Sequence, residues 1–176
     1  MSAIELWTDG SGTTGAPGGW AFMLRHRDAD GKIFDLLNGG RLPETTNNRA
    51  ELTAAIEGLR ALKRSCALTV VTDSEYVMKG FTEDRVSKWR DRGWRTGQGK
   101  PVANQDLWEL LEAEVLRHDV SWRHVRGHAG IEENELVDCV AGMMRREAIE
   151  ALNESAPPSS TLDGAEAPQA TRGGER

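Results

Sequence analysis

The chain lacks the features that mark membrane-spanning and disulfide-stabilised proteins. It has only two cysteines, Cys66 and Cys139, which lie far apart and have no CxxC partner. This count and spacing fit small buried thiols in a reducing compartment better than a disulfide or a cysteine zinc site. No window approaches the run of about eighteen apolar residues that a membrane helix needs, and the N-terminal MSAIELW lacks the basic and apolar regions of a signal peptide. We therefore expect a soluble, cytoplasmic protein with no membrane partner.

The C-terminal segment lacks aromatic residues and has almost no large aliphatic ones. From Ala151 it reads ALNESAPPSSTLDGAEAPQATRGGER and holds three of the six prolines of the chain. Such a segment cannot bury enough apolar surface to offset the entropy lost on ordering. We predict one folded domain over residues 1–150 and a disordered tail over residues 151–176.

The chain also lacks overall positive charge. It has 22 lysines and arginines against 28 acidic residues, a formal net charge of −6. This balance argues against indiscriminate nucleic-acid binding. Residues 79–100, however, hold seven basic and three acidic residues, a local charge of +4. The asymmetry predicts one surface that meets a polyanion.

The hydrophobic pattern alternates between strand and helix signals. Period-two alternation or short apolar runs predict strands, and apolar residues three to four apart predict helices. Asn48 is a candidate N-cap of the long helix that follows the third strand. The early hairpins and the later strand–helix alternation predict a mixed sheet covered by helices. The expected strands are residues 4–9, 20–27, 32–40, 67–72 and 119–125, and the expected helices are residues 48–64, 74–80, 104–118 and 133–151.

Four carboxylates stand at the ends of these predicted elements. Asp9 and Asp73 end strands in similar contexts, LWTDGS and VVTDSE, so their side chains emerge side by side if the strands are neighbours. Glu51 lies in the first turn of the long helix, and Asp138 lies one turn after Asn134 on the last helix. Crowded like charges are unfavourable unless cations neutralise them, and oxygen ligands select hard ions such as Mg²⁺ or Mn²⁺. The pattern is that of a metal site.

Each carboxylate also has a purely structural interpretation. Asp9 precedes a glycine and is suited to begin a turn. Asn48 and Glu51 have the spacing of a capping box, Asp73 could cap the short helix after it, and Asp138 could be a solvated helix residue. The convergence of all four at the ends of elements that one mixed sheet would bring together favours the metal site.

His128 lies between glycines in the loop VRGHAG, just before the last predicted helix. A lone loop histidine is usually a surface residue. Beside a metal-activated water, a group that titrates near neutrality could instead shuttle protons, and a mobile loop would let it move in and out.

The same residues resemble type 1 ribonuclease H, the bacterial family that cuts the RNA strand of RNA/DNA hybrids. The matching stretches are TDGS, TTNNRAEL, TDSEYV, RGWRT with KPVANQDLW, and VRGHAGIEENELVD. They occur in the order and spacing of the family and cover nearly all of residues 1–150. The resemblance implies an α/β ribonuclease H-like fold: a five-stranded mixed sheet, antiparallel in strands one to three, with helices on both faces.

The resemblance also implies the chemistry of the site. Matched motif by motif, it makes Asp9, Glu51, Asp73 and Asp138 the metal-binding catalytic acids and His128 the auxiliary catalytic residue. Asp9 would be the shared ligand of two Mg²⁺ ions, for which Mn²⁺ could substitute. One ion would activate the attacking water and the other, about 4 Å away, would stabilise the departing 3′ oxygen. The products would carry 5′-phosphate and 3′-hydroxyl ends. The strand would hold Asp9 rigidly at the sheet edge, and the glycines after it would let the nucleic-acid backbone approach.

Hybrid recognition follows from the same resemblance. RNA displays its 2′-hydroxyls in the wide minor groove of an A-like helix, where polar side chains can contact them. Asn47, Asn48 and Glu75 lie where the family makes minor-groove contacts, and Thr46 lies where it meets a DNA phosphate. Residues 79–100 resemble the basic protrusion that grips the DNA strand through phosphate contacts. Its expected contact residues are Lys88, Arg90, Arg92, Trp94 and Arg95.

Residues 79–100 also have a purely structural interpretation, in which they form a solvated helix and Trp89 and Trp94 pack into the core. We expect this to hold for at least one of the two tryptophans.

Three positions depart from the family pattern. Ala16 stands where an asparagine is common, Glu75 where some members have glutamine, and Asp91 dilutes the basic protrusion. The missing asparagine side chain at residue 16 predicts weaker affinity. The charge of Glu75 could repel phosphate unless its neighbours hold it away. None of the three changes removes a metal ligand.

The expected activity is therefore that of a Mg²⁺-dependent endonuclease acting as a monomer on RNA/DNA hybrids. A hybrid-binding module that does not cleave is the alternative hypothesis, and a structure-specific DNA nuclease on the same scaffold is a third.

Overall fold

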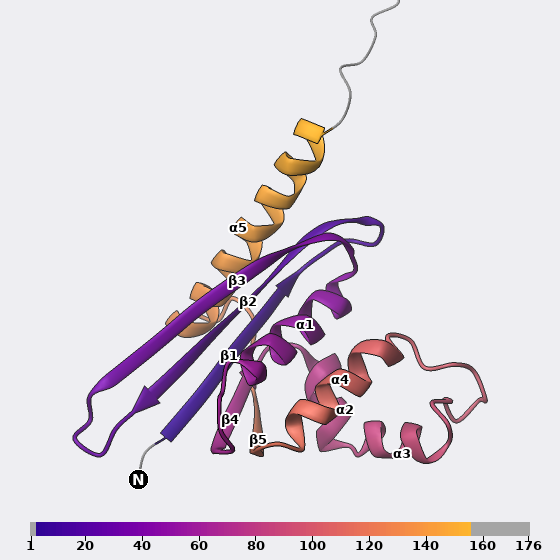
Figure 1. Ribbon diagram of the computed structural model, residues 1–176, viewed down its shortest axis with the longest axis horizontal. Helices are drawn as coiled ribbons and strands as arrows, with labels where there is room; N and C mark the ends of the chain where they lie inside the picture. Colours follow the sequence, from indigo (N-terminus) through magenta and orange to yellow (C-terminus); the bar gives the residue numbers. More distant parts are fainter. Residues whose placement is uncertain (1–2, 156–176) are drawn as a thin grey trace, which may run out of the picture.

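The fold is built on a five-stranded mixed sheet, which the computed structural model describes together with its helices over residues 3–155 (Figure 1). The strand order is β3-β2-β1-β4-β5. β1 pairs antiparallel with β2, which pairs antiparallel with β3, whereas β1, β4 and β5 are parallel. The predicted mixed sheet with three antiparallel leading strands is confirmed. The strands are β1 (Ala3–Ser11), β2 (Ala16–Arg27), β3 (Ile33–Thr45), β4 (Ala67–Thr72) and β5 (Asp119–His124).

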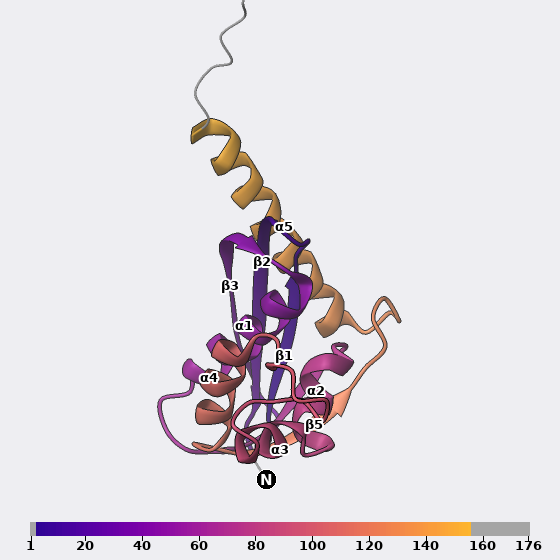
Figure 2. The ribbon, with the colours of Figure 1, turned by 90° about the vertical axis from the view of Figure 1, so that its right-hand side faces the viewer.

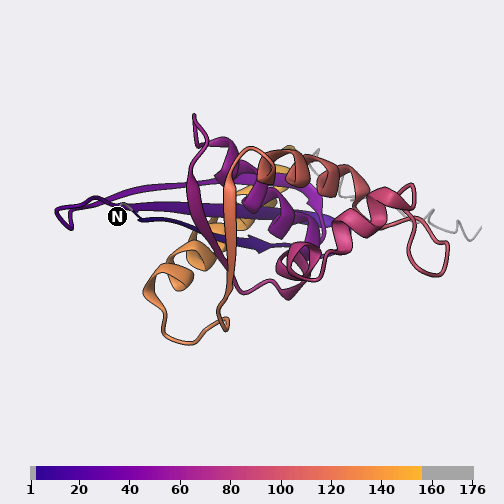
Figure 3. The same ribbon diagram turned by 90° about the horizontal axis from the view of Figure 1, so that it is seen from below.

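Helices cover both faces of the sheet, as predicted. α1 (Asn47–Arg60) lies on one face beside α4 (Gln105–Val115), and α5 (Glu132–Ser155) crosses the other face (Figures 2 and 3). The structure has two hydrophobic cores, one on each face of the sheet. Of two consecutive residues of β1, Leu6 packs into the core beneath α1 (the α1 core) and Trp7 into the core beneath α5 (the α5 core). This is the period-two alternation that the sequence shows.

β2 and β3 are both longer than predicted. The sequence interpretation placed the glycines at residues 18–19 and 39–40 in turns or at strand ends, but they lie within the strands. For Gly19 and Gly39 the reason is close approach of α5: a Cβ on Gly19 would stand 2.3 Å from the carbonyl oxygen of Ala141, and a Cβ on Gly39 would stand 3.0 Å from Val140 Cγ1. A Cβ on Gly40 would instead meet the Trp20 ring. Gly19 and Gly39 therefore make room for a helix that lies far away in the sequence.

The cap of α1 differs from the prediction. Its N-cap is Thr46, whose hydroxyl accepts a hydrogen bond from the Arg49 backbone N–H at 3.3 Å. Asn48, the predicted cap, lies inside the first turn, because β3 extends to Thr45 and the helix starts immediately afterwards. Glu51 is then two residues beyond the position that a capping box requires, so that structural alternative is wrong.

α5 continues to Ser155, beyond the predicted domain boundary at residue 150. The segment from 151 to 155, predicted to be disordered, is helical, and Figure 1 shows this end of α5 projecting past the sheet. Residues 156–176 of the predicted tail lie outside the described residues.

The basic segment folds as two short helices and a loop. α2 (Glu75–Thr82) starts at the N-cap Ser74, and α3 (Arg85–Asp91) was not predicted as a separate helix. The Trp89 ring meets that of Trp108 at 5.5 Å between centroids, and Trp94 is also half-buried against the α1 core. The expectation that at least one of these tryptophans packs into the core is confirmed. Within residues 3–155, no helix is long and apolar enough to cross a membrane.

Candidate metal centre

Three carboxylates meet at one edge of the sheet. Asp9 is on β1, Asp73 directly follows β4, and Glu51 projects from α1. The two strands are parallel neighbours in which Thr8 pairs with Thr72, so the acidic residues that follow each threonine emerge side by side. Each of the three residues offers an oxygen within 4.8 Å of the other two. The predicted convergence holds for these three residues.

Glu51 reaches the strand ends because α1 lies directly against β1. A Cβ on Gly10 would stand 2.2 Å from the Glu51 backbone nitrogen. The sequence interpretation gave the glycines after Asp9 the role of admitting the nucleic-acid backbone. For Gly10 this interpretation is wrong, because the backbone of α1 occupies that space. Gly10 sets the distance between Asp9 and Glu51.

Asp138 joins the site from α5, on the opposite face of the sheet from α1. It lines the same cavity of about 460 Å³ as the other three acids, and its side chain is half-exposed. The negative charge of Asp138 contributes to the raised pKa of Asp9. Asp138 therefore stands at the rim of the cluster formed by Asp9, Glu51 and Asp73.

The electrostatics of the cluster are unfavourable without a cation. Burial, followed by the charges of Asp73 and Asp138, raises the pKa of Asp9 to about 7. Burial and the neighbouring Asp9 and Asp73 likewise raise the pKa of Glu51 well above its usual range. Glu51 Oε2 is buried and has no hydrogen-bond partner among residues 3–155. A buried carboxylate oxygen without a donor, among other carboxylates, fits a hard divalent cation.

His128 lies at the mouth of this cavity. Its side chain is 83% exposed, and its Nδ1 stands 3.7 Å from Asp138 Oδ2. The backbone there has φ of 53°, in the left-handed region, within the loop that joins β5 to α5. The structure thus places His128 beside the acidic cluster, as the sequence predicted.

The residues predicted to contact the minor groove gather around the same cavity. Asn47, Asn48 and Glu75 all line it. Asn47 bridges two elements, because its Oδ1 accepts from the Gly12 N–H at 3.3 Å and its Nδ2 donates to Glu51 Oε1 at 3.4 Å. Lys79 forms an ion pair with Glu75 and lowers the pKa of that carboxyl. The negative charge of Glu75, a departure from the family pattern, is therefore partly offset.

The five predicted basic-contact residues lie on α3 and in the loop after it, beside α2 and α4 in Figure 1. None of these five residues lines the cavity. Arg90 forms an ion pair with Glu112 at 2.5 Å, which connects the Arg90 side chain to α4. Lys88 donates to the carbonyl of Glu83, and Arg95 to that of Gly99. Arg92 is exposed and Trp94 is half-buried.

One buried polar residue at the site was not assigned a role from sequence. Asn134 on α5 is 2% exposed, and its Nδ2 donates to Asp73 Oδ2 at 3.5 Å. Its Oδ1 has no partner within the described part of the chain. The available signal was its position one helical turn before Asp138, which places both side chains on one face of α5.

Comparison with known proteins decides the family. The model of the RNase H family matches residues 1–145. The chain belongs to the RNase H family. It is 49% identical over 140 residues to the ribonuclease H of Bordetella avium, covering 78% of this chain and 87% of the relative. It is 52% identical over 140 residues to that of Bordetella pertussis, with 78% and 86% covered.

Solved structures agree with this assignment of the RNase H fold. LC9-RNase H1, described as a type 1 RNase H with the type 2 active-site motif, matches with a TM-score of 0.75 at 31% identity, over 84% of this chain and 74% of that one. The foamy viral protease-reverse transcriptase in complex with an RNA/DNA hybrid shares the fold with a TM-score of 0.65 at 19% identity, over 82% of this chain and 20% of that one. The resemblance to type 1 ribonuclease H is confirmed.

Proposed function

We propose that the protein is a divalent-cation-dependent endonuclease that hydrolyses the RNA strand of RNA/DNA hybrids. The observation that carries the proposal is the cluster of Asp9, Glu51 and Asp73, whose oxygens lie within 4.8 Å of one another in a member of the RNase H family. Cleavage would leave 5′-phosphate and 3′-hydroxyl ends. The curated relatives named ribonuclease H support this assignment.

Asp9, Glu51, Asp73 and Asp138 would hold the cations. The orphaned Glu51 Oε2 and the raised pKa of Asp9 both fit positive charge at this place. Two Mg²⁺ ions, or Mn²⁺ in their place, would supply an activated water and charge stabilisation of the departing 3′ oxygen. Asp9, central to the cluster, would be shared between them.

The remaining residues of the site would orient the substrate and handle protons. His128, exposed and beside Asp138, is positioned to take up or release a proton at its ring nitrogens as products leave. Asn47, Asn48 and Glu75 line the cavity and would contact 2′-hydroxyls in the minor groove. Thr46 would lie near a DNA phosphate.

The basic residues of α3 and its following loop would grip the DNA strand. Lys88, Arg90, Arg92 and Arg95 carry charge that suits phosphate contacts, and Trp94 would support that surface. Because the grip depends on charge, salt should weaken hybrid binding.

The direct test is cleavage of end-labelled duplexes with and without Mg²⁺. We expect cuts in the RNA strand of a hybrid and none in double-stranded RNA or double-stranded DNA. Binding without cleavage under every divalent cation would instead establish a hybrid-binding module, and cleavage of double-stranded DNA would establish a DNA nuclease. Asp9→Asn and Asp73→Asn should each abolish turnover without unfolding the protein. Asp30→Asn, in the exposed β2–β3 turn, is the control and should keep normal turnover. Normal turnover by a folded Asp9→Asn or Asp73→Asn variant would remove that residue from the mechanism.

A further inference from the structure

β3 is an edge strand whose outer side is open. In the described part of the chain, residues 33–44 of this strand pair only with β2. Every residue from 33 to 38 is exposed, so neither face of this part of the strand is covered. Proteins usually protect such edges with charges, bulges or a covering segment, because an open edge pairs readily with another strand. The open side of β3 is therefore available to a further strand.

The exposed part of β3 is mainly apolar. Leu37 pairs with Met23 of the α5 core, so the odd-numbered side chains lie on the α5 face of the sheet and the even-numbered ones on the α1 face. The single acid among them, Asp35, forms an ion pair with Arg25. Large apolar side chains exposed on both faces of an open edge indicate a protein-binding surface. Four such side chains are each 40–51% exposed: Ile33, Phe34, Leu36 and Leu37.

A groove of about 290 Å³ lies beside β3 on the α5 face. Arg41 in its lining is exposed and takes part in no ion pair with any residue from 3 to 155. Leu152, from the last turns of α5, is 55% exposed. The groove thus offers an apolar surface and one cation to an occupant. Its lining residues are Arg41, Pro43, Ala148, Ala151, Leu152 and Ser155.

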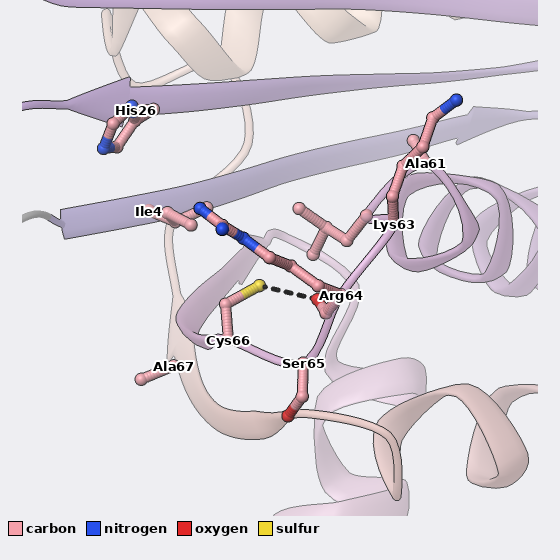
Figure 4. Close-up of a pocket in the computed structure, with 9 residues that line it drawn as sticks. Ile4, His26, Ala61, Lys63, Arg64, Ser65, Cys66 and Ala67 are labelled. Atoms are coloured by element: carbon pink, nitrogen blue, oxygen red, sulfur yellow. Dashed lines mark hydrogen bonds between the residues drawn. The ribbon is translucent and has the colours of Figure 1, made fainter.

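This surface is separate from the larger cavity at the start of β1. That cavity, of about 940 Å³, is lined by Ile4, His26 and residues 61–67, and by no residue of β3 (Figure 4). The His26 ring stacks on that of Phe34 at 6.0 Å between centroids. Because β2 lies between β1 and β3, the open edge of β3 faces away from this cavity.

The sequence of β3 is complementary to itself when two copies run antiparallel about Asn38. Counted outward from Asn38, Asp35 of one copy stands opposite Arg41 of the other, and Phe34 stands opposite Leu42. Among the registers centred on residues 36–40, only this one places Asp35 opposite a basic residue. Opposite charges at directly opposed positions stabilise antiparallel strands, and like charges destabilise them.

The same register brings an apolar side chain to the groove. Directly opposed residues share a face of the sheet, so Ile33 of one copy, opposite Pro43 of the other, lies on the α5 face. Because Pro43 and Arg41 both line the groove, Ile33 adjoins its apolar surface while Asp35 reaches Arg41. Two-fold symmetry repeats both contacts. One arrangement therefore covers the exposed edge and the groove and supplies an acidic partner for Arg41.

We propose that two copies of this chain pair antiparallel through β3, in the register centred on Asn38, and form a symmetric dimer with a continuous sheet. A second copy is the favoured occupant because this chain itself supplies the apolar side chains, the groove that receives them and both members of the ion pair. The dimer differs from the monomer expected from the sequence. The proposal does not depend on the nuclease assignment, because none of its tests has a catalytic readout.

Sedimentation velocity of the full chain tests the association. Over concentrations from about 1 to 300 µM, we expect a shift from monomer to dimer with a Kd in the micromolar range, because one strand pair buries less surface than a permanent dimer interface does. A monomer over the whole range would overturn the proposal.

Charge exchange tests the register. Arg41→Glu and Asp35→Lys should each weaken dimerisation about tenfold, because like charges then oppose each other at two places. An equimolar mixture of the two variants should form heterodimers of near-native affinity, since every contact then joins opposite charges. Arg146→Glu, the same charge change on the exposed side of α5, should have no effect. Circular dichroism checks folding, because Asp35→Lys also removes the ion pair with Arg25. A mixture of folded variants that stays monomeric would overturn the proposal.

Ile33→Ser tests the contact with the groove. Loss of its apolar side chain should weaken dimerisation severalfold. Leu116→Ser, at a 75% exposed leucine after α4, is the matched control and should leave the Kd unchanged. An equal effect of both substitutions, or of neither, would contradict the proposed interface.

A disulfide trap locates the two-fold axis. Opposed Cα atoms of antiparallel strands lie about 4.5–5.5 Å apart, which suits a disulfide. Asn38→Cys should therefore cross-link two copies in oxidised glutathione, in a chain with Cys66→Ser and Cys139→Ser. Leu36→Cys in the same background is the control, because the two copies of residue 36 would lie about 13 Å apart along the strands. Equal cross-linking of both variants, or none with Asn38→Cys, would refute this register.

Discussion

Gly10 of β1 lies so close to α1 that an added Cβ would stand 2.2 Å from the backbone nitrogen of Glu51. Both nearby atoms beyond that nitrogen are also backbone, so no side-chain rotation can relieve the contact. The absence of a side chain at residue 10 therefore lets a strand and a helix approach closely enough for Asp9 and Glu51 to place oxygens within 4.8 Å of each other.

Replacing Gly10 with alanine should damage both stability and turnover. The added methyl group must push α1 away from β1, which we expect to cost about 1–3 kcal/mol in the free energy of unfolding. Because that movement separates Asp9 from Glu51, kcat should fall by more than the loss of folded protein explains. Urea denaturation and hybrid-cleavage kinetics measure the two effects. Gly142→Ala is the control, since an added Cβ there would meet only the end of the Arg146 side chain at 3.6 Å. Normal kcat in a folded Gly10→Ala variant would contradict this account.

The raised pKa of Asp9 predicts how stability depends on pH when no divalent cation is bound. In the folded protein this pKa is about 7, against 3.8 for the unfolded reference. Between these values the folded state holds a proton that the unfolded state has lost, so the free energy of unfolding falls as pH rises and levels off above the folded pKa. The raised pKa of Glu51 acts in the same direction.

Asp9→Asn removes the penalty for ionising residue 9. In the presence of a chelator, the variant should be more stable than the native chain at about pH 8, by the order of 1–3 kcal/mol, and the difference should shrink toward about pH 4. Urea denaturation at both pH values measures it, with Asp30→Asn as the surface control. A difference that grows as pH falls would have the wrong sign for a carboxyl of raised pKa.

Mg²⁺ should reverse this instability. A cation that binds only the folded chain stabilises it by about 2.7 kcal/mol at a hundredfold excess over its Kd. We therefore expect Mg²⁺ to raise the Tm of the native chain and of Asp30→Asn, but to have little effect on Asp9→Asn or Asp73→Asn. Thermal unfolding followed by circular dichroism, with matched NaCl to keep ionic strength equal, is the measurement. An equal rise in all four proteins would indicate general screening of charge rather than binding at the cluster.

The central part of the site could be predicted because its signals are local. Asp9 and Asp73 each follow a short apolar run, and they come together because the parallel pairing of β1 with β4 ends at Thr8 and Thr72. Once α1 is placed on the sheet, Glu51 in its first two turns is expected to lie near both aspartates. Asp138 needed the further expectation that helices cover both faces of the sheet, which the motif resemblance supplied.

The parts that the sequence did not predict depend on contacts between distant residues. Thr45, Thr46, Asn47 and Asn48 form a run in which all four residues are good N-caps, and the actual cap is fixed by β3 pairing with β2 up to Thr45. Gly19 belongs to a strand because α5 crosses above it, which the local pattern does not reveal. Asn134 has a role at the site only because Asp73, 61 residues earlier, lies beneath it.

Asn134 provides a last prediction, since its Nδ2 hydrogen bond restrains the Asp73 carboxylate. Removing a residue that orients a metal ligand typically weakens metal affinity about 10–100-fold. Asn134→Ala should therefore shift the Mg²⁺ dependence of hybrid cleavage to higher concentration by that factor, with kcat partly restored at saturating Mg²⁺. Asn153→Ala, an exposed asparagine on the same helix, is the matched control. If Asn134 served only to fill the core, the variant would lose stability but keep the midpoint of its Mg²⁺ titration, and that result would exclude a positioning role for Asn134 toward Asp73.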